Sequence, residues 1–419
     1  MLTFFQKIVL KTSNFALNSK FKSYFDISLS KNLSIKPSNK DYMLYIHVPF
    51  CHTFCTYCGF HKYLYDEELA KRYFENLRKE IKQTKELGFD FSTVYVGGGT
   101  TLINEDELLK TLQLCKTLFN IKEISCESDP NHIDAESLKN FQGLIDRLSC
   151  GVQSFNDNVL KKTNRYHKFG SSKELINKLE KAISILPIFS IDLIFNFPTQ
   201  SEDELLYDLQ VAKNLQANQI TTYPLMKSKL SKKLITKSFG KNLKDRELEF
   251  YELIQDFFKD YKQNNCWSFS LKKEELSDEY VSYHNDYLGL GSGAFSFIDN
   301  ELLINAFDLN EYEKLVNEGA NAKISKISFK QKDILRYNFL TKLFSTKLDI
   351  AKFNQNFACD LEKDLSLEIK ALKMANFVYE KDGVLYLSKQ GQYLFVTLMK
   401  EFYTNMDTVR AFFKKTNAL

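Results

Sequence analysis

Long apolar runs are missing from this chain of 419 residues. No stretch approaches the roughly 20 consecutive apolar residues that a membrane-spanning helix needs, so we expect no membrane span. Proline and glycine are scarce, at 6 and 15 residues, which excludes a collagen-like or largely disordered chain. The net charge of +4 is small for this length, so we expect no nucleic-acid binding, which usually requires a clustered basic face. The length itself predicts two or three structural units.

We also expect no secretory signal. A lysine interrupts the apolar start MLTFFQKIVL, and no small-residue cleavage site follows. We therefore expect a cytoplasmic protein, a compartment in which disulfides are rare. Five of the 8 cysteines are scattered along the chain, and we expect them to be small buried residues. The other three, Cys51, Cys55 and Cys58, fall within eight positions and require a chemical explanation.

Short strand-like runs alternate with longer stretches of helical period from residue 41 onward. Six strand-then-helix units in series predict an all-parallel sheet with right-handed crossovers. We expect a partial (β/α)6 barrel, an α/β fold whose functional residues lie at the C-terminal ends of the strands. The strand-like runs are 42–48, 93–96, 123–127, 146–152, 190–197 and 219–225, and the clearest helix-like stretches are 66–87, 105–119 and 201–216.

The C-terminal quarter of the chain breaks this alternation. Two alternating runs joined at Asp382-Gly383 predict a hairpin among helices, which is typical of a winged-helix-like module. Because no basic recognition helix is evident, we expect this module to pack on the core or to cover a substrate. The helices are expected at 330–346, 348–355, 360–375 and 390–404. We therefore divide the chain into an N-terminal extension (1–40), a core (41–325) and a helical C-terminal domain (326–419).

The first strand-like run leads into the segment CHTFCTYC, which holds the three clustered cysteines. Thiolates at this spacing can bind a metal centre. Iron–sulfur clusters and tetrahedral zinc sites both usually take four protein ligands. Three cysteines would leave one iron of a cluster open to another ligand, whereas a zinc site would need His52 or His61 as its fourth ligand. Both interpretations stay open on these residues alone.

The wider context YIHVPFCHTFCTYCGF resembles the radical-SAM signature, and in particular the oxygen-independent coproporphyrinogen III oxidase and haem chaperone family. The resemblance covers residues 42–300, with a weaker match beyond. It implies a [4Fe–4S] cluster on Cys51, Cys55 and Cys58, whose open iron binds S-adenosylmethionine and whose electron cleaves it to a 5′-deoxyadenosyl radical.

Further segments match the same family in order along the chain. Three glycines followed by Thr100 can let a backbone loop approach a ligand closely, although a plain tight turn would use the same residues. Acidic and amide side chains follow later strands, and a charge such as Asp192 on an apolar strand needs a partner. The resemblance implies that the cofactor is bound by Tyr45, Gly98, Gly99, Thr100, Glu127, Gln153, Arg165 and Asp192.

The glycine-rich segment 283–297 begins with Tyr-His-Asn and matches a stretch that borders the reaction cavity in the family. His284 could meet a haem iron or a propionate, but a hydrogen-bonded structural histidine is the preferred interpretation. Two positions match neither subgroup. The oxidases have a fourth cysteine where this chain has Phe60, and the chaperones usually have an aspartate where it has Gly59.

The resemblance implies an oxidoreductase that acts on a tetrapyrrole in porphyrin or haem metabolism, for example by oxidative decarboxylation of propionates. The alternative is a haem chaperone that binds haem and delivers it without net chemistry. Expected partners are the tetrapyrrole, which could be haem itself, and a low-potential electron donor such as flavodoxin or ferredoxin. We expect a monomer.

Overall fold

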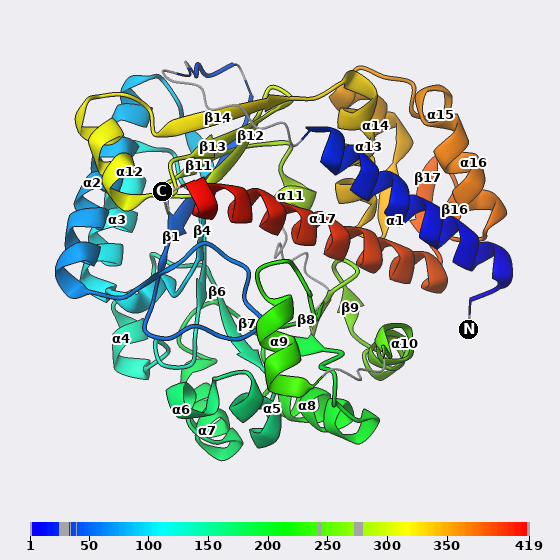
Figure 1. Cartoon of the computed structure of the whole chain (residues 1–419), viewed down its shortest axis with the longest axis horizontal. Helices are drawn as coiled ribbons and strands as arrows, with labels where there is room; N and C mark the ends of the chain where they lie inside the picture. The colour runs from blue at the N-terminus through cyan, green and yellow to red at the C-terminus, as the bar shows by residue number, and fades with distance from the viewer. Residues whose placement is uncertain are drawn as a thin grey trace.

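A computed structural model gives the fold of the chain and describes residues 2–24, 33, 35–38, 40–240, 245–271 and 280–416. Figure 1 shows strands ringed by helices on one side of the molecule and a helical C-terminal region on the other. The first helix, α1 (Phe4–Tyr24), and the last, α17 (Lys389–Thr416), lie side by side across that region. α1 therefore packs on the body of the protein, and part of the expected N-terminal extension, 25–32, lies outside the described residues.

Six parallel strands form the centre of the molecule. They run in the order β1-β4-β5-β6-β7-β8, which is also their order along the chain, and every neighbouring pair is parallel. The strands are almost wholly buried, as a sheet covered on its outer face by helices requires. Their bounds are β1 (Tyr42–Val48), β4 (Phe91–Gly98), β5 (Glu123–Ser128), β6 (Arg147–Gln153), β7 (Ile188–Phe195) and β8 (Gln219–Pro224).

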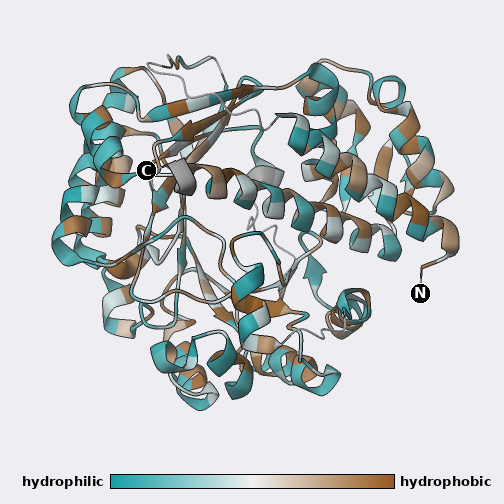
Figure 2. Ribbon diagram, in the orientation of Figure 1, coloured by the Kyte–Doolittle hydropathy of each residue, from teal (hydrophilic) through white to brown (hydrophobic). Residues whose placement is uncertain are grey.

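Helices follow these strands on the outside, and their starts are fixed by local capping. Ser171 and Ser201 each form a capping box with a glutamate three residues later, and Asp66 and Asn104 cap two other helices. Figure 2 shows hydrophilic and hydrophobic residues mixed along these helices, as expected for helices with one buried face. They are α2 (Glu67–Glu86), α3 (Glu105–Leu118), α4 (Ala135–Lys139), α5 (Asp157–Lys162), α6 (Tyr166–Phe169), α7 (Ser172–Ala182), α8 (Glu202–Asn214), α9 (Lys232–Phe239) and α10 (Glu247–Phe257).

The six-strand parallel core is confirmed, but the prediction of an all-parallel sheet is wrong at both edges. Next to β1 lies β11 (Asp286–Leu290), also parallel, followed by antiparallel β12 (Phe295–Ile298), β13 (Glu301–Asn305) and β14 (Lys323–Ser328). Asp299 and Asn300 both have positive φ, which permits a tight hairpin between β12 and β13. Beyond β8 lie antiparallel β10 (Ser268–Ser270) and β9 (Lys262–Gln263), so the barrel stays open.

The C-terminal region combines helices with a small antiparallel sheet of order β15-β17-β16, as the winged-helix-like prediction required. Asp382 and Gly383, both at positive φ, form the expected hairpin. Its elements are α13 (Gln331–Leu343), β15 (Lys347–Asp349), α14 (Ile350–Phe357), α15 (Leu361–Asp364), α16 (Ser366–Met374), β16 (Val378–Lys381) and β17 (Val384–Leu387), whereas α12 (Leu309–Asn317) packs against α2 on the other side of the molecule (Figure 1).

The last helix is much longer than the predicted 390–404. α17 runs from Lys389 to Thr416 and crosses from the small sheet back to the barrel (Figure 1). Its far end packs on the core, because the ring of Phe413 stacks on Phe307 at 5.0 Å and 6°. The C-terminal helix thus reaches the end of the barrel at which the site lies. Among the helices that the structure describes, none has both the length and the apolar character needed to cross a bilayer.

Candidate active site

A cavity of about 290 Å3 opens at the C-terminal ends of the core strands. All eleven residues that the sequence analysis selected line it, although they come from widely separated parts of the chain. The structure therefore brings the whole set together, whereas the role of each residue stays a prediction. The set consists of Tyr45, Cys51, Cys55, Cys58, Gly98, Gly99, Thr100, Glu127, Gln153, Arg165 and Asp192.

The three cysteines lie on one loop that leaves β1. Its base is closed by the short parallel pair β2 (Phe50–Cys51) and β3 (Tyr63–Leu64). Cys51 is buried, and burial together with the neighbouring Cys58 raises the pKa of its thiol to about 11. Cys55 is half-buried, and its sulfur accepts a hydrogen bond of 3.4 Å from Arg165 Nη1. The loop is thus held to the barrel both at its base and at its tip.

The described residues do not support a zinc site on this loop. No group of three or more His, Cys, Asp or Glu side chains among them is gathered closely enough to hold a single metal ion. His61 Nε2 lies 3.1 Å from Ser292 Oγ, and the ring of His52 stacks on His132 at 5.9 Å. His61 thus directs one ring nitrogen to Ser292, and His52 packs its ring against His132. Three thiols spread around a cavity suit a group larger than one ion, such as an iron–sulfur cluster.

The glycine loop after β4 packs directly on the start of the cysteine loop. Gly99 N–H donates to Val48 O at 2.8 Å, and Thr100 N–H donates to Phe50 O at 2.7 Å. A Cβ on Gly99 would overlap the backbone of Phe50. Gly98 has φ +121°, and a Cβ there would lie 2.6 Å from the His47 ring. Glycine is therefore required for close approach and for backbone conformation, which a plain surface turn would not explain.

Buried charges on β5 lie beside this loop. Glu127 accepts hydrogen bonds from Tyr95 OH at 2.9 Å and from Gly98 N–H at 3.2 Å, and burial raises the pKa of its carboxyl. Asp129 pairs with Lys168 at 2.6 Å and accepts a bond from Thr100 Oγ1 at 2.9 Å. Burial opposes the charge of Asp129, but Lys168, His132 and the hydrogen bond from Thr100 together outweigh burial and lower the pKa of this carboxyl. The cavity wall thus holds Asp129, whose carboxylate stays ionised, and Glu127, whose carboxyl is easier to protonate.

Among the selected residues that the structure describes, two have a buried polar atom in the cavity wall without a hydrogen-bond partner. The two atoms are Gln153 Oε1, an acceptor, and Arg165 Nε, a donor. Gln153 also has φ +76° where β6 and β7 shift register, a costly conformation that tends to occur at binding sites. A bound ligand that carries both an ammonium and a carboxylate group would satisfy the two atoms. The methionine part of S-adenosylmethionine has these two groups, so the residues present fit this cofactor.

The remaining predicted contacts lie on strands of the same cavity. Asp192 on β7 is partnered, as a charge on an apolar strand must be, because Ser149 Oγ donates to its carboxylate at 2.7 Å. Tyr45 on β1 places its hydroxyl 2.9 Å from His47 Nδ1. His47 Nε2 lies 3.1 Å from the carbonyl of His61, so the imidazole connects β1 to the cysteine loop.

The glycine-rich segment 283–297 borders the cavity with only some of its residues. Gly293 and Phe295 line the cavity, but His284 is not among its lining residues. The backbone carbonyl of His284 accepts a bond of 3.2 Å from Lys342 Nζ, and burial lowers the pKa of its imidazole. This agrees with a structural histidine.

Several cavity residues were not selected from the sequence. Asp129 and Lys168 each follow a selected residue within three positions, so their place beside a strand end was a usable signal. Tyr403, Asp407 and Arg410 come from α17, and Trp267 comes from the loop before β10. Asp407 and Arg410 could have been selected from the sequence, because they form a charged pair among the aromatic and apolar residues of FYTNMDTVRAFF.

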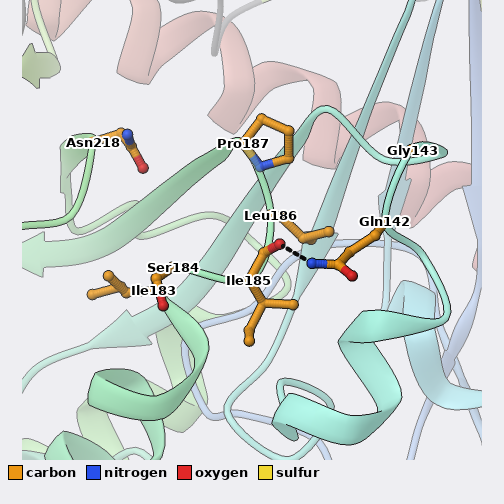
Figure 3. Close-up of a pocket in the computed structure, with 8 residues that line it drawn as sticks. All are labelled: Gln142, Gly143, Ile183, Ser184, Ile185, Leu186, Pro187 and Asn218. Carbon is orange, nitrogen blue, oxygen red and sulfur yellow. Dashed lines mark hydrogen bonds between the residues drawn. The ribbon is translucent and has the colours of Figure 1, made fainter.

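A second hollow, of about 420 Å3, lies at the opposite ends of the strands. Figure 3 shows its wall, which consists of the turns that precede β6, β7 and β8. Gln142 Nε2 donates to Ile185 O at 3.0 Å across it. No charged residue lines this hollow, and catalytic residues of such barrels lie at the other end. The cavity with the cysteines is therefore the candidate active site.

Comparisons with known proteins agree with this geometry. Residues 45–212 match the family model of the Radical SAM superfamily. The haem chaperone HemW of Bacillus subtilis is 26% identical over 373 residues, which cover 84% of this chain and 96% of that protein. An oxygen-independent coproporphyrinogen III oxidase of Helicobacter pylori is 28% identical over 379 residues, covering 83% and 81%. The structure of coproporphyrinogen III oxidase (HemN) from Escherichia coli covers 92% of this chain and 98% of its own, with a TM-score of 0.74 at 22% identity, and shares the fold.

The open barrel and its three-cysteine loop define a protein of the radical SAM class. Residues 45–212 of the chain form a radical SAM domain, and the chain has relatives named as haem chaperones and as oxygen-independent coproporphyrinogen III oxidases. Its cofactors are accordingly a [4Fe–4S] cluster and S-adenosylmethionine, and its chemistry is that of a radical SAM enzyme. When bound and reduced, the cluster supplies the electron that cleaves S-adenosylmethionine and gives a 5′-deoxyadenosyl radical.

Proposed function

We propose that this chain is an enzyme of the oxygen-independent coproporphyrinogen III oxidase family and that it acts on a tetrapyrrole. The observation that carries the proposal is the single cavity into which all eleven selected residues converge. In this proposal Cys51, Cys55 and Cys58 hold the cluster. The other eight residues bind S-adenosylmethionine.

Each of these residues has a definable task. The glycine loop lets a ligand approach its backbone closely, Gln153 Oε1 and Arg165 Nε offer an acceptor and a donor, and Glu127 offers a carboxylate. Buried aromatic side chains such as Trp267 and Phe295 exclude water from the rest of the wall. A water-poor cavity protects a carbon radical from side reactions and keeps it within van der Waals reach of one substrate C–H bond.

The reaction we propose is oxidative decarboxylation of a propionate side chain. The propionate loses a hydrogen atom to the 5′-deoxyadenosyl radical, which becomes 5′-deoxyadenosine. The substrate radical then loses CO2 and one further electron to an acceptor, and a vinyl group remains. The balance is a two-electron oxidation of the side chain, in which S-adenosylmethionine takes the hydrogen atom and an electron acceptor takes the electron.

A second candidate function is haem binding without net chemistry, as in a haem chaperone. Two observations favour it. The Bacillus relative that bears this name is matched over 96% of its length. Position 60, at which the oxidases have a fourth cysteine, is a half-exposed phenylalanine that lines the cavity. A chaperone would bind haem stoichiometrically and would cleave S-adenosylmethionine without changing the porphyrin.

One anaerobic experiment separates these candidates. Reconstituted, reduced protein is incubated with coproporphyrinogen III or with haem, and the porphyrin products and 5′-deoxyadenosine are quantified. The enzyme proposal predicts vinyl products from coproporphyrinogen III in proportion to 5′-deoxyadenosine. Formation of 5′-deoxyadenosine with unchanged coproporphyrinogen III, combined with stoichiometric haem binding, would instead support the chaperone. If the protein neither turned over the porphyrin nor bound haem, both candidate functions would be contradicted.

Three further proposals accompany this function. The chain works in the cytoplasm, since thiols that are to bind an iron–sulfur cluster must stay reduced, and it works as a monomer. A low-potential donor such as flavodoxin or ferredoxin supplies the electron. The division into an extension (1–40), a core (41–325) and a C-terminal domain (326–419) describes how the chain is organised for this task.

A further inference from the structure

One face of α17 forms part of the wall of the active-site cavity. Tyr403, Asp407 and Arg410 all line it, and their spacing of four and three residues places them on one side of a helix. Met406, Val409 and Phe413 of the same helix are buried in the core. The end of α17 is therefore anchored, and it presents a polar stripe to the cavity.

Arg410 is held rigidly within this stripe. Its side chain is 11% exposed, and its guanidinium lies over the rings of Phe60 at 5.0 Å and Phe295 at 5.4 Å. Nη1 donates to Asp407 Oδ1 at 2.6 Å, which is the one hydrogen bond of this guanidinium to a described residue. A guanidinium has five N–H donors, so most of those of Arg410 stay available to a ligand in the cavity.

Asp407 connects this arginine to the cysteine loop. A Cβ on Gly59, the residue after Cys58, would overlap the Asp407 carboxylate, so the two segments are in direct contact. Asp407 engages one edge of the guanidinium and leaves its other N–H groups free. Arg410 is thus oriented at a fixed position relative to the loop that holds the three cysteines.

The other cavity cations are engaged with neighbouring protein groups, and one of them, Lys62, donates to Cys58 O at 2.9 Å. Lys168 forms an ion pair with Asp129, and Arg165 donates to Gly151 O, Tyr57 OH and Cys55 Sγ. Trp267 adds an uncharged donor, because its Nε1 is buried in the cavity wall and has no hydrogen-bond partner among the described residues. The cavity therefore has unused hydrogen-bond donors on and near α17, since the Trp267 ring lies beside Tyr403 of that helix.

We propose that Arg410 binds a carboxylate of the substrate and so makes the site selective for tetrapyrroles with free acidic side chains. This inference rests on the proposed function and deepens it. A guanidinium pairs with a carboxylate through parallel N–H bonds, and in a buried site such bonds are strong. A ligand without a carboxylate would leave those N–H groups without water and without a partner, so the site discriminates against it.

The test compares two probes that differ only in their acidic groups, coproporphyrin III and its tetramethyl ester. Trp267 is the one tryptophan of the chain and lines the cavity, so quenching of its fluorescence reports binding there. The variants are Arg410→Ala and Arg410→Lys, which keeps the charge but loses the planar fork. Arg72→Ala is the matched control, since Arg72 lies on α2 with a side chain 52% exposed and paired to Glu313. The reconstituted protein is used throughout, and iron content verifies that each variant is folded.

We expect Arg410→Ala to weaken coproporphyrin III binding by about tenfold or more, as expected for a lost charge-assisted hydrogen bond. Arg410→Lys should lie between Arg410→Ala and the wild type. Binding of the ester should not change, and Arg72→Ala should resemble the wild type with both probes. Equal weakening of both probes in Arg410→Ala would assign a structural role instead, and unchanged affinity would also overturn the inference. If the wild type binds neither probe, the proposed tetrapyrrole function fails as well.

Discussion

Cys51, Cys55 and Cys58 have different surroundings, although they share one short loop. Cys51 is buried beneath the glycine loop, where Thr100 Oγ1 lies 3.8 Å from its sulfur. Cys55 is approached by Arg165, and Cys58 is followed by the glycine that contacts Asp407. Each thiol therefore lies against a different part of the cavity wall. Loss of any one thiol should disturb binding of the whole cluster.

Replacement of any one of these cysteines by serine should abolish the cluster, because an alcohol is a poor ligand for iron in place of a thiolate. We expect the iron content of each variant to fall to roughly a tenth of the wild-type value or less, and S-adenosylmethionine cleavage to be lost. Cys359→Ser, a half-buried cysteine of the C-terminal region, is the matched control and should keep the iron. A brown, active Cys55→Ser protein would contradict the assignment.

His47 predicts a pH dependence of stability. Burial lowers the pKa of its imidazole to about 4, whereas the unfolded chain titrates near 6.5. The unfolded state therefore binds more protons between these values, and stability is lost as the pH falls from 6.5 towards 4. Protonation of His47 in the unfolded state should therefore lower the unfolding free energy by about 2 kcal/mol between pH 7 and pH 5.

The measurement is urea unfolding of the wild type and of His47→Gln at both pH values. Gln has no proton to gain, so the unfolding free energy of the variant should fall by about 2 kcal/mol less than that of the wild type between pH 7 and pH 5. Taking the difference between the two proteins removes the other titrating groups. Equal losses in both proteins would show that His47 does not titrate in this range.

At the scale of elements, the strands that carry the site were predictable and the edges of the sheet were not. The run YMLYIHV is continuously apolar or aromatic, and it forms β1 with the predicted bounds, 42–48. The hairpin FSFIDNELLI lacks glycine at its turn, because Asp299 and Asn300 adopt positive φ in its place. Pairing of β11 with β1 joins residues about 240 positions apart, a contact that local patterns do not encode.

The glycine loop gives a prediction at this scale. Gly99→Ala should force the loop away from Phe50 and disturb the start of the cysteine loop, because backbone atoms of Phe50 cannot move aside as a flexible side chain would. We expect a loss of about 2 kcal/mol in unfolding free energy and weaker S-adenosylmethionine binding, measured by thermal unfolding and by titration.

Gly319→Ala is the control for this change. Gly319 has positive φ, +71°, which Gly99 does not, and a Cβ there meets open space. Gly319→Ala should lower the unfolding free energy by about 1 kcal/mol through backbone conformation alone and leave cofactor binding intact. If the two variants bound S-adenosylmethionine equally well, close packing of the glycine loop would not be what the cofactor requires.

At the scale of the whole molecule, contacts between distant segments close the site, and local sequence patterns gave little sign of them. The end of α17 covers the cavity some 350 residues after the cysteine loop, in a helix predicted to stop at residue 404. Glu80 is another such contact. It lies on the apolar face of α2, and a charge at such a position was the available signal of a buried network.

Glu80 joins α2 to the segment beyond β11. Its carboxylate accepts bonds from Gly291 N–H at 2.8 Å, Asn305 Nδ2 at 3.0 Å and Tyr312 OH at 2.7 Å. Glu80→Ala leaves three buried donors unsatisfied and should cost roughly 3 kcal/mol of unfolding free energy, measured by chemical denaturation. Glu68→Ala, on the exposed side of the same helix, should change it by about 0.5 kcal/mol or less. Equal effects would show that the network does not hold the molecule together.

The central claim is that three thiolates leave one iron open to S-adenosylmethionine. The most direct measurement is electron paramagnetic resonance of the anaerobically reconstituted, reduced protein with and without S-adenosylmethionine. We predict a [4Fe–4S] signal that changes when S-adenosylmethionine is added, accompanied by formation of 5′-deoxyadenosine. A protein that takes up no iron and sulfide, or a cluster signal that added S-adenosylmethionine leaves unchanged, would contradict the account.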